Sequence, residues 1–494
     1  MKFSITLPAC ALALATLTLG CSDDGSYDDY STFGGGTSGG DGDDEGSSGL
    51  DPSAGQGGAQ DFGRFREILL AGGIPGPETI DDLGFFAEHK IAMPKAECGE
   101  NVCIHGMLGV MGNMISGSNC TIVLLGMNTP IDPDTLERPP LNLAIAMDLS
   151  GSMQGEPIER LRAGLLTMLD ELEPDDRISL IGFSDEAELL VSQLGAADPE
   201  LAATIEGLVA GSRTNIYDGL RSAFEEVQAH AEDGRQNRVI LVSDGLANVG
   251  LTSSETIEGL AESYGEAGFN LTTIGIGDDF DVDLMRELAE IGSGSFYYID
   301  EPAALEEVFA EEVQAFVVPL AEDVEIDARM LEGYDLRRVY GTTQFELWGN
   351  DAYVDIPILQ IAHRVSDEDN ENGRRGGGGA IIIELTPTGL DPAAVGEIDF
   401  RYVEPGTGDV IEQQVAIASP LAPWETPSEG HFESESTEKG FVMLNIYVGF
   451  EMAAQRASVG DYAGALTVLR PLRDSVSSWL LDHDDADIAD DLIY

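Results

Sequence analysis

An apolar run that ends in one carboxylate and two hydroxyls constrains the fold more than any other feature of this chain. Residues 141–147 read Leu-Asn-Leu-Ala-Ile-Ala-Met, and Asp148, Ser150 and Ser152 follow directly. A short run of this kind before a polar loop predicts a buried parallel strand whose carboxyl end opens onto a site. Oxygen side chains at positions i, i+2 and i+4 of a tight loop are ligands of the type that hard divalent cations such as Mg²⁺ and Mn²⁺ take.

Two later segments supply oxygen side chains of the same kind. Thr214 precedes a predicted helix, in the stretch Gly-Ser-Arg-Thr-Asn-Ile-Tyr-Asp-Gly-Leu that spans residues 211–220. Asp244 ends a second apolar strand, in Arg-Val-Ile-Leu-Val-Ser-Asp-Gly over residues 238–245. The loops at the carboxyl ends of parallel strands gather at one edge of a sheet, so these side chains are expected to meet.

Asp148, Ser150, Ser152, Thr214 and Asp244 resemble, in order and spacing, the metal-ion-dependent adhesion site of von Willebrand factor type A (VWA) domains. None of the five positions departs from that pattern. The resemblance implies a divalent cation, Mg²⁺ with Mn²⁺ or Ca²⁺ as alternatives, held by these five residues. It also implies an open coordination position that takes a carboxylate from a partner protein. An Asp-Ser turn that holds no metal is the other reading.

Strand and helix patterns alternate across residues 141–317, which predicts an α/β fold with a largely parallel sheet covered on both faces. The resemblance implies that this segment is a Rossmann-like VWA domain. The expected strands are 141–147, 177–184, 237–243, 269–276 and 295–299, with 187–193 as an antiparallel edge partner; the expected helices are 156–172, 215–231, 253–266, 281–291 and 302–316.

The segments on either side of the predicted VWA domain do not show its alternation of strand and helix patterns. Residues 61–140 predict helices followed by strands, 318–420 predict a β-rich domain of short strands, and 421–494 predict a C-terminal helical hairpin with a frayed acidic tail. We expect strands from before residue 130 to pair with strands from after residue 320. The VWA domain would then be inserted into a single β-sandwich.

The amino terminus has the pattern of an export signal. An apolar run over residues 5–19 has the length of a signal peptide's hydrophobic core rather than of a membrane span. Gly20 and Cys21 resemble the lipobox of bacterial lipoproteins, although Thr18 stands where a Leu is usual. The resemblance implies that residues 1–20 are a lipoprotein signal peptide and that Cys21 carries lipid. The protein would then be anchored to a bacterial membrane in the cell envelope, in the periplasm or on the surface. Ordinary secretion with cleavage nearby is the alternative.

Residues 21–60 are rich in Gly, Asp and Ser and contain no Lys or Arg, so we expect a disordered tether there. The whole chain carries 90 acidic and 25 basic residues, a net charge of −65. This charge argues against nucleic acid as a partner and favours solubility, cation affinity or a basic partner.

Export favours a disulfide among Cys98, Cys103 and Cys120, because exported proteins meet an oxidising compartment. Three pairings are possible. A bond between Cys98 and Cys103 would close the shortest loop.

The sequence favours a binding protein over an enzyme. The six His are scattered without metal-ligand spacing, and Ser150 and Ser152 have no nearby His to activate them. The leading hypothesis is an exported, membrane-anchored adhesion or scaffold module that binds an acidic residue of a partner protein through its metal. The alternative is a structural subunit of an envelope complex with a stabilising metal. A hydrolase acting through the metal is the third hypothesis, and it lacks a general base beside the site.

Overall fold

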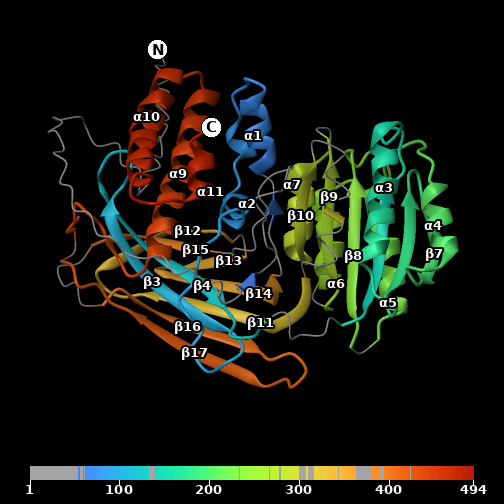
Figure 1. The fold of residues 1–494 in the computed structure, drawn as a ribbon, viewed down its shortest axis with the longest axis horizontal. Helices are drawn as coiled ribbons and strands as arrows, with labels where there is room; N and C mark the ends of the chain where they lie inside the picture. The colour runs from blue at the N-terminus through green and yellow to red at the C-terminus, as the bar shows by residue number, and fades with distance from the viewer. Residues whose placement is uncertain are drawn as a thin grey trace, which may run out of the picture.

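The computed structural model describes three sheets and their helices (Figure 1). The predicted signal peptide, Cys21 and most of the predicted tether lie outside the described residues, as does nearly all of the predicted helix 302–316. The described residues are 54–55, 59–60, 62–132, 139–232, 234–265, 267–277, 280–299, 308–309, 316–342, 344–362, 380–388, 394–422 and 424–493.

The first sheet is the α/β unit that the alternating pattern predicts, with strand order β2-β10-β9-β8-β5-β6-β7. All neighbouring strands are parallel except β7, which pairs antiparallel with β6 at one edge as expected. Its strands are β2 (Ala59–Gln60), β5 (Leu141–Asp148), β6 (Arg177–Phe183), β7 (Ala187–Leu194), β8 (Gln236–Ser243), β9 (Asn270–Ile276) and β10 (Ser293–Ile299).

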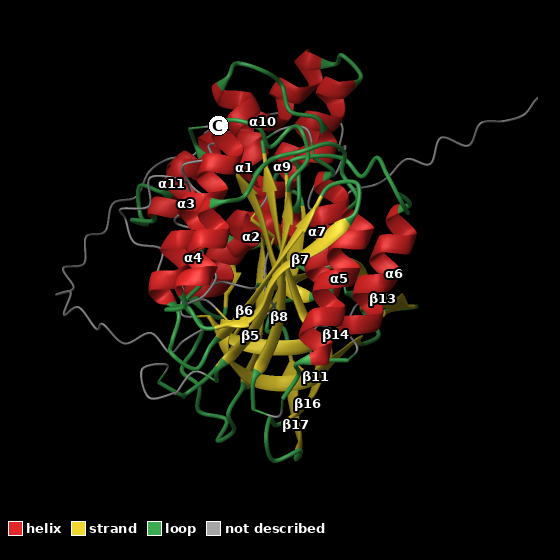
Figure 2. Cartoon of the chain, turned by 90° about the vertical axis from the view of Figure 1, so that its right-hand side faces the viewer, coloured by secondary structure: helices red, strands yellow, loops and turns green. Residues whose placement is uncertain are grey.

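Helices cover both faces of this sheet, as Figure 2 shows from its edge. Along β5, Leu143, Ile145 and Met147 pack with α3 and α4, whereas Ala144 and Ala146 pack with α5. This burial on both faces is why residues 143–147 of the strand are all apolar. The helices are α3 (Glu156–Glu171), α4 (Pro199–Glu206), α5 (Ile216–Ala229), α6 (Ser254–Gly265) and α7 (Val282–Ile291); α4 is an addition to the predicted set.

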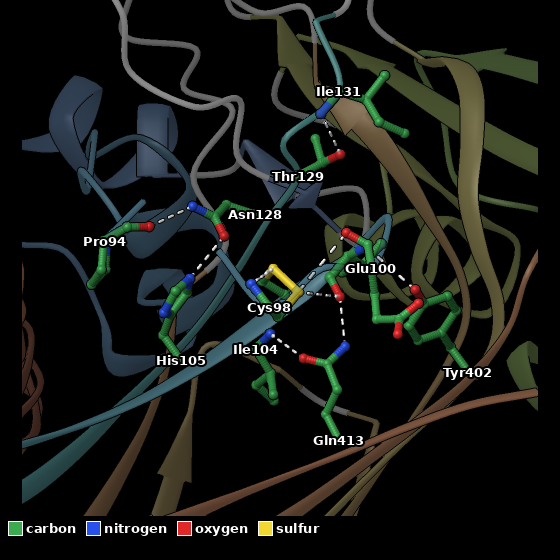
Figure 3. Close-up of a disulfide and its surroundings, with 12 residues drawn as sticks. Pro94, Cys98, Glu100, Ile104, His105, Asn128, Thr129, Ile131, Tyr402 and Gln413 are labelled. Carbon is green, nitrogen blue, oxygen red and sulfur yellow. Dashed lines mark hydrogen bonds between the residues drawn. A yellow bond between two sulfur atoms is a disulfide. The ribbon is translucent and has the colours of Figure 1, made fainter. Parts of the chain in front are cut away.

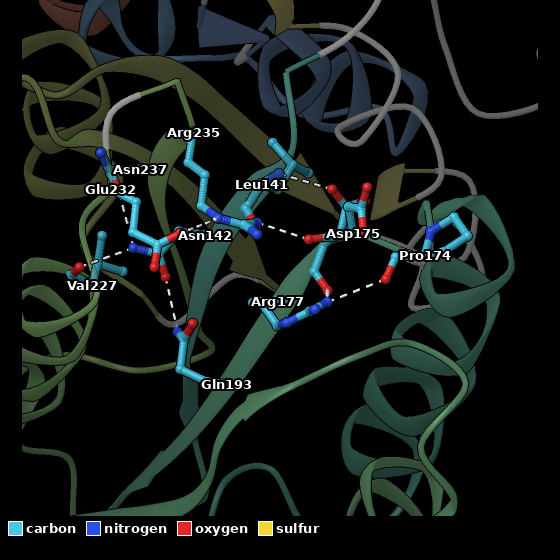
Figure 4. A network of polar contacts seen from close by, with 11 residues as sticks. Leu141, Asn142, Pro174, Asp175, Arg177, Gln193, Val227, Glu232, Arg235 and Asn237 are labelled. Atoms are coloured by element: carbon cyan, nitrogen blue, oxygen red, sulfur yellow. Dashed lines mark hydrogen bonds and ion pairs between the residues drawn. The ribbon is translucent and has the colours of Figure 1, made fainter.

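Polar side chains hold together the amino ends of these strands, at the edge opposite the site (Figure 4). The Asn142 amide donates to the Val227 carbonyl (2.9 Å) and to Asn237 Oδ1 (2.8 Å), and its own oxygen accepts from Gln193 Nε2 (2.9 Å). Arg235 donates to the carbonyl of Asp175 (2.7 Å). These bonds link β5, β7 and α5 with β8, and so help to fix the strand register that aligns their carboxyl ends.

The other two sheets form a sandwich below the helices in Figure 1. One has the order β12-β15-β4-β3-β18; the other has the order β1-β14-β11-β16-β17, with β13 paired to β14. The strands of the two sheets of the sandwich are β1 (Ala54–Gly55), β3 (Cys103–Gly112), β4 (Asn119–Asn128), β11 (Phe316–Met330), β12 (Tyr334–Tyr340), β13 (Phe345–Trp348), β14 (Asp351–Ala362), β15 (Ile381–Pro387), β16 (Gly396–Val403), β17 (Val410–Ile417) and β18 (His431–Phe432).

The pairing of β4 with β15, in which Val123 lies opposite Ile383, confirms that strands on the two sides of the α/β unit share one sheet. Alternate residues of β4 face different cores. Val123 and Leu125 point into the sandwich, and Ile122 and Leu124 point to the helices above it. The expectation of one sandwich interrupted by the α/β unit is therefore confirmed.

Two short strands correct the predicted tether. β1 pairs with β14 in the sandwich, and β2 pairs with β10 in the parallel sheet. A disordered tether that reaches residue 60 is wrong at these four residues. Strand pairing uses backbone hydrogen bonds, so it does not need the apolar side chains that this stretch lacks.

A disulfide joins Cys98 to Cys103, with 5.6 Å between their Cα atoms (Figure 3). Of the three possible pairings, this is the one with the shortest loop. The loop leads into β3 and is tied to the facing sheet, because the Val102 amide donates to the Tyr402 hydroxyl (3.3 Å) and Gln413 Nε2 donates to the Val102 carbonyl (2.7 Å).

The C-terminal helical hairpin lies on the outer face of the five-stranded sheet. It consists of α9 (Glu435–Ser458) and α10 (Tyr462–Trp479), and a short helix, α11 (Ala486–Asp491), follows. The prediction of a frayed acidic tail is wrong for α11. Ile488 is buried there, and the Asp491 carboxylate lies 2.8 Å from His89 Nε2.

A short helix, α2 (Asp82–Ala87), joins the α/β unit to the sandwich and hairpin. Its Leu83 belongs to the core of the α/β unit, whereas Phe85 and Phe86 belong to the core beneath α9. Two polar contacts reinforce the junction: Arg286 of α7 lies 3.9 Å from Asp81, and Gln344 donates to the Glu290 carbonyl at 2.8 Å. Before α2 the chain forms α1 (Phe62–Leu70) and a 3₁₀ turn, η1 (Pro77–Thr79).

Asp82 makes the stability of this junction depend on pH. Burial, with the charge of Asp81 adding to it, raises the pKa of Asp82 to about 6. The folded protein therefore holds a proton that the unfolded chain releases at lower pH, and stability falls as pH rises through this window. We expect Asp82→Asn to remove this loss and to raise the free energy of unfolding at pH 7.5 by about 3 kcal/mol, with little effect at pH 4.

Urea denaturation at the two pH values measures this effect. Asp474→Asn, at an exposed position beside Arg473, serves as the control and should change little at either pH. An Asp82→Asn variant that gains no stability at pH 7.5 relative to pH 4 would contradict the prediction.

Candidate metal-binding site

The pairing of β5 with β8 places the two predicted carboxylates at one edge of the parallel sheet. Met147 lies opposite Val242, so Asp148 and Asp244 emerge from the carboxyl ends of adjacent strands. Ser243 Oγ, between them, donates to Asp148 Oδ2 at 2.6 Å. Ser243 is a part of the site that the sequence pattern did not single out.

A continuous series of oxygen atoms runs from the first loop to the second strand. Asp148 Oδ1 accepts from the Ser150 amide at 2.8 Å, which closes the tight turn after β5. Ser150 Oγ lies 3.0 Å from Ser152 Oγ, and Ser152 Oγ donates to Asp244 Oδ1 at 2.8 Å. Four of the five predicted residues are thus in one hydrogen-bonded group.

Thr214 joins this group through the backbone of its loop. Gly211 donates to the Leu149 carbonyl at 2.5 Å, and Gly151 donates to the Ser212 carbonyl at 3.2 Å. A Cβ atom added at Gly245 would lie 3.4 Å from Thr214 Oγ1 and 3.7 Å from Ser152 Oγ. The Thr214 and Ser152 hydroxyls therefore face the same small space, which the missing side chain of Gly245 leaves open.

Three further residues hold the Thr214 loop in place, and none follows from the sequence motif. Asn248 Oδ1 accepts from the Thr214 amide at 3.0 Å, and the Thr214 carbonyl accepts from the Asn248 amide at 3.0 Å. Asp185 accepts from the Ser212 hydroxyl and, at 2.5 Å, from Arg213 Nε. Asn215 caps α5, with its Oδ1 accepting from the Asp218 amide.

The site is buried on the side of the sheet and open on the side of the loops. Asp148 is 0% exposed, Thr214 is 3% exposed and Asp244 is 7% exposed, whereas Ser152 is exposed. Burial raises the pKa of Asp148, and hydrogen bonds from Ser243 and Ser150 act in the opposite direction. A cation beside this carboxylate would favour its charged form.

The oxygen set fits a small hard cation. Neighbouring ligands of an octahedral Mg²⁺ at about 2.1 Å lie about 3.0 Å apart. The separations from Ser150 to Ser152 and from Ser152 to Asp244 already have that size. Among the described residues there is no group of three or more His, Cys, Asp or Glu that could hold a metal.

Comparisons with known proteins agree with this fold. The model of the von Willebrand factor type A domain matches residues 142–311. The uncharacterized protein sll0103 of Synechocystis is 25% identical over 346 residues, which cover 67% of this chain and 78% of that protein. The uncharacterized protein YfbK of Escherichia coli is 29% identical over 196 residues, covering 39% of this chain and 34% of its own length.

A solved structure, von Willebrand factor type A from Catenulispora acidiphila, has the same fold over 79% of this chain and 89% of that chain, with a TM-score of 0.51 and 15% identity. The match and the shared fold therefore place a von Willebrand factor type A domain within residues 142–311 of this chain.

Proposed function

We propose that this protein binds a partner protein through a divalent cation held by Asp148, Ser150, Ser152, Thr214 and Asp244. The observation that carries the proposal is the series of oxygen atoms from Ser150 through Ser152 to Asp244, whose spacing suits one small cation. The hydroxyls are neutral, so only the two carboxylates would offset the charge of the cation. A cation bound in this way keeps affinity for one more anionic ligand, such as a carboxylate of a partner.

The chain's own residues would orient such a complex. Ser243 and the Ser150 amide fix both oxygens of Asp148, and Asn248 fixes the backbone of Thr214. The exposed Ser152 marks the side from which a partner can approach. Because these ligands are already held in place, little free energy is spent on ordering them when a partner binds. A single contact bridged by the metal can then contribute both affinity and a defined orientation of the partner.

A chelator distinguishes a bridging metal from one that only stabilises an envelope subunit. Full-length protein would be immobilised and exposed to solubilised envelope proteins of the source cell, in Mg²⁺ and in EDTA. A bridging metal predicts that the partner is lost in EDTA while the domain stays folded, with its melting temperature lowered only by the loss of the bound cation. Retention of the partner in EDTA, or unfolding of the domain there, would count against the proposal.

We further propose that the protein acts in the bacterial cell envelope, anchored by lipid at Cys21. In the described part of the chain, none of the helices combines the length and hydropathy that a membrane span requires. We expect Cys21→Ala to move the protein from the membrane fraction to the soluble fraction, because the lipid would be its anchor.

Fractionation with immunodetection measures this shift, and Cys10→Ala is the control that leaves Cys21 in place. A Cys21→Ala protein that still sediments with membranes after a salt wash would contradict lipid anchoring.

A further inference from the structure

We propose that the partner segment recognised at the candidate metal site carries one acidic residue flanked by large apolar side chains. This inference rests on the proposed function and adds the class of ligand. Three exposed apolar residues carry it, Val209, Leu246 and Leu251, which we call the apolar rim.

The apolar rim comes from the same two loops that supply the site. Val209 lies five residues before Thr214, and Leu246 lies two residues after Asp244. Leu251 follows Gly250, whose backbone packs against the Asn215 side chain. The two loops are joined by the paired hydrogen bonds between Thr214 and Asn248, so the rim residues lie in the loops that adjoin the oxygen group.

The rim residues are exposed, and the chain beside Val209 is anchored. Val209 is 74% exposed, Leu246 is 55% exposed and Leu251 is 51% exposed, whereas the neighbour of Val209, Leu208, is 3% exposed. The Leu208 carbonyl also accepts a hydrogen bond from Arg162. Because Leu208 is anchored, Val209 cannot turn inward without breaking that packing. Apolar side chains fixed outward around a polar centre are typical of a protein-binding surface.

Charge restricts the ligand further. A net charge of −65 repels an extended acidic surface, so an acidic ligand has to concentrate its charge at one point. Near the Thr214 loop, the exposed Arg213 is paired with Asp185 at 2.5 Å, and this pair adds no net charge to the rim. A single carboxylate on the cation, with apolar neighbours on the rim, satisfies both conditions.

Four synthetic peptides test the inference on full-length protein by fluorescence anisotropy. They present Glu between Leu residues, Glu between Ser residues, Gln between Leu residues and Gln between Ser residues. In Mg²⁺, burial of the Leu side chains should make the Leu-flanked Glu peptide bind about tenfold more tightly than the Ser-flanked one.

The triple variant Val209→Ser, Leu246→Ser and Leu251→Ser should lose this preference and still bind the Ser-flanked Glu peptide as the wild type does. Leu481→Ser is the matched control, because Leu481 is 84% exposed and follows α10, a helix that lies away from the α/β unit in Figure 1. It should keep the preference.

The outcomes separate the two proposals. Equal binding of the two Glu peptides to the wild type would overturn the apolar rim and leave metal-dependent recognition standing. A preference for Leu that persists in EDTA or with Gln would also overturn it, since the acid and the rim would not act together. Failure of both Glu peptides to bind in Mg²⁺ would overturn the proposed function and this inference with it.

Discussion

Asp148→Ala is expected to lower the affinity of the protein for Mg²⁺ more than about a hundredfold, because one carboxylate with neutral hydroxyls holds a hard dication weakly. The Asp148 carboxylate is fully buried at the end of β5 and is the most enclosed negative charge of the site. Its loss leaves Asp244 as the single carboxylate beside Ser150 and Ser152. Isothermal titration calorimetry with Mg²⁺ and Mn²⁺ measures the change.

Two variants separate loss of the ligand from loss of the fold. Asp148→Asn keeps the volume of the side chain and an acceptor oxygen for the Ser150 amide, so it should stay folded and still bind the cation poorly. Thr214→Ala removes one neutral hydroxyl and should have a smaller effect than either. In the wild type, saturating Mg²⁺ at about a hundred times Kd should add about 2.7 kcal/mol to the free energy of unfolding. Unchanged Mg²⁺ affinity in Asp148→Asn would refute the assignment.

Local sequence patterns predict the parallel sheet and the position of the site. The central strands β5, β6 and β8 contain short apolar runs, since helices cover both of their faces, and the site residues stand at strand ends or before a helix. The positions of Asp148 and Asp244 follow from this pattern and from the rule that loops gather at the carboxyl ends of parallel strands. The pairing of β5 with β8, at whose carboxyl ends Asp148 and Asp244 lie, bears out that prediction.

The residues that support the site carried no such signal. Ser243 is one more polar residue at a strand end. Asn248 lies in a loop, and no repeating pattern of apolar residues in the sequence predicts the path of that loop. Asp185 belongs to the turn between β6 and β7, far in sequence from the Ser212 and Arg213 that it binds. Contacts of this kind depend on which loops become neighbours in space. Composition and spacing do not encode that information for irregular segments.

Long-range order at the two ends of the chain was the other part that local patterns missed. The acidic tail was expected to fray, yet α11 is fixed by Ile488 and by the contact of Asp491 with His89, about four hundred residues earlier. The role of α2 in joining the α/β unit to the sandwich likewise depends on the residues that it packs against. Its Leu83 and its Phe85 serve two different cores, and a six-residue helix gives no sign of this in its sequence.

Phe85→Ala is expected to lower the free energy of unfolding by about 3–5 kcal/mol, the range for removing a large buried aromatic ring. Phe85 is 0% exposed, and its ring centroid lies 4.6 Å from that of His89, 5.7 Å from that of Phe86 and 6.0 Å from that of Tyr447. A cavity there would loosen α2 from the core beneath α9 and leave Leu83 in the core of the VWA domain.

The same change should alter the cooperativity of unfolding. While α2 is seated in both cores, opening one core exposes apolar surface of the other, and the two should unfold in a single transition. With Phe85→Ala, calorimetry should resolve a lower transition for the sandwich and hairpin from a transition of the VWA domain, and Mg²⁺ should raise only the latter. Leu70→Ala, at a position 71% exposed at the end of α1, is the control and should cost less than about 0.5 kcal/mol. If Phe85→Ala costs less than about 1 kcal/mol and leaves one transition, α2 does not couple the two cores.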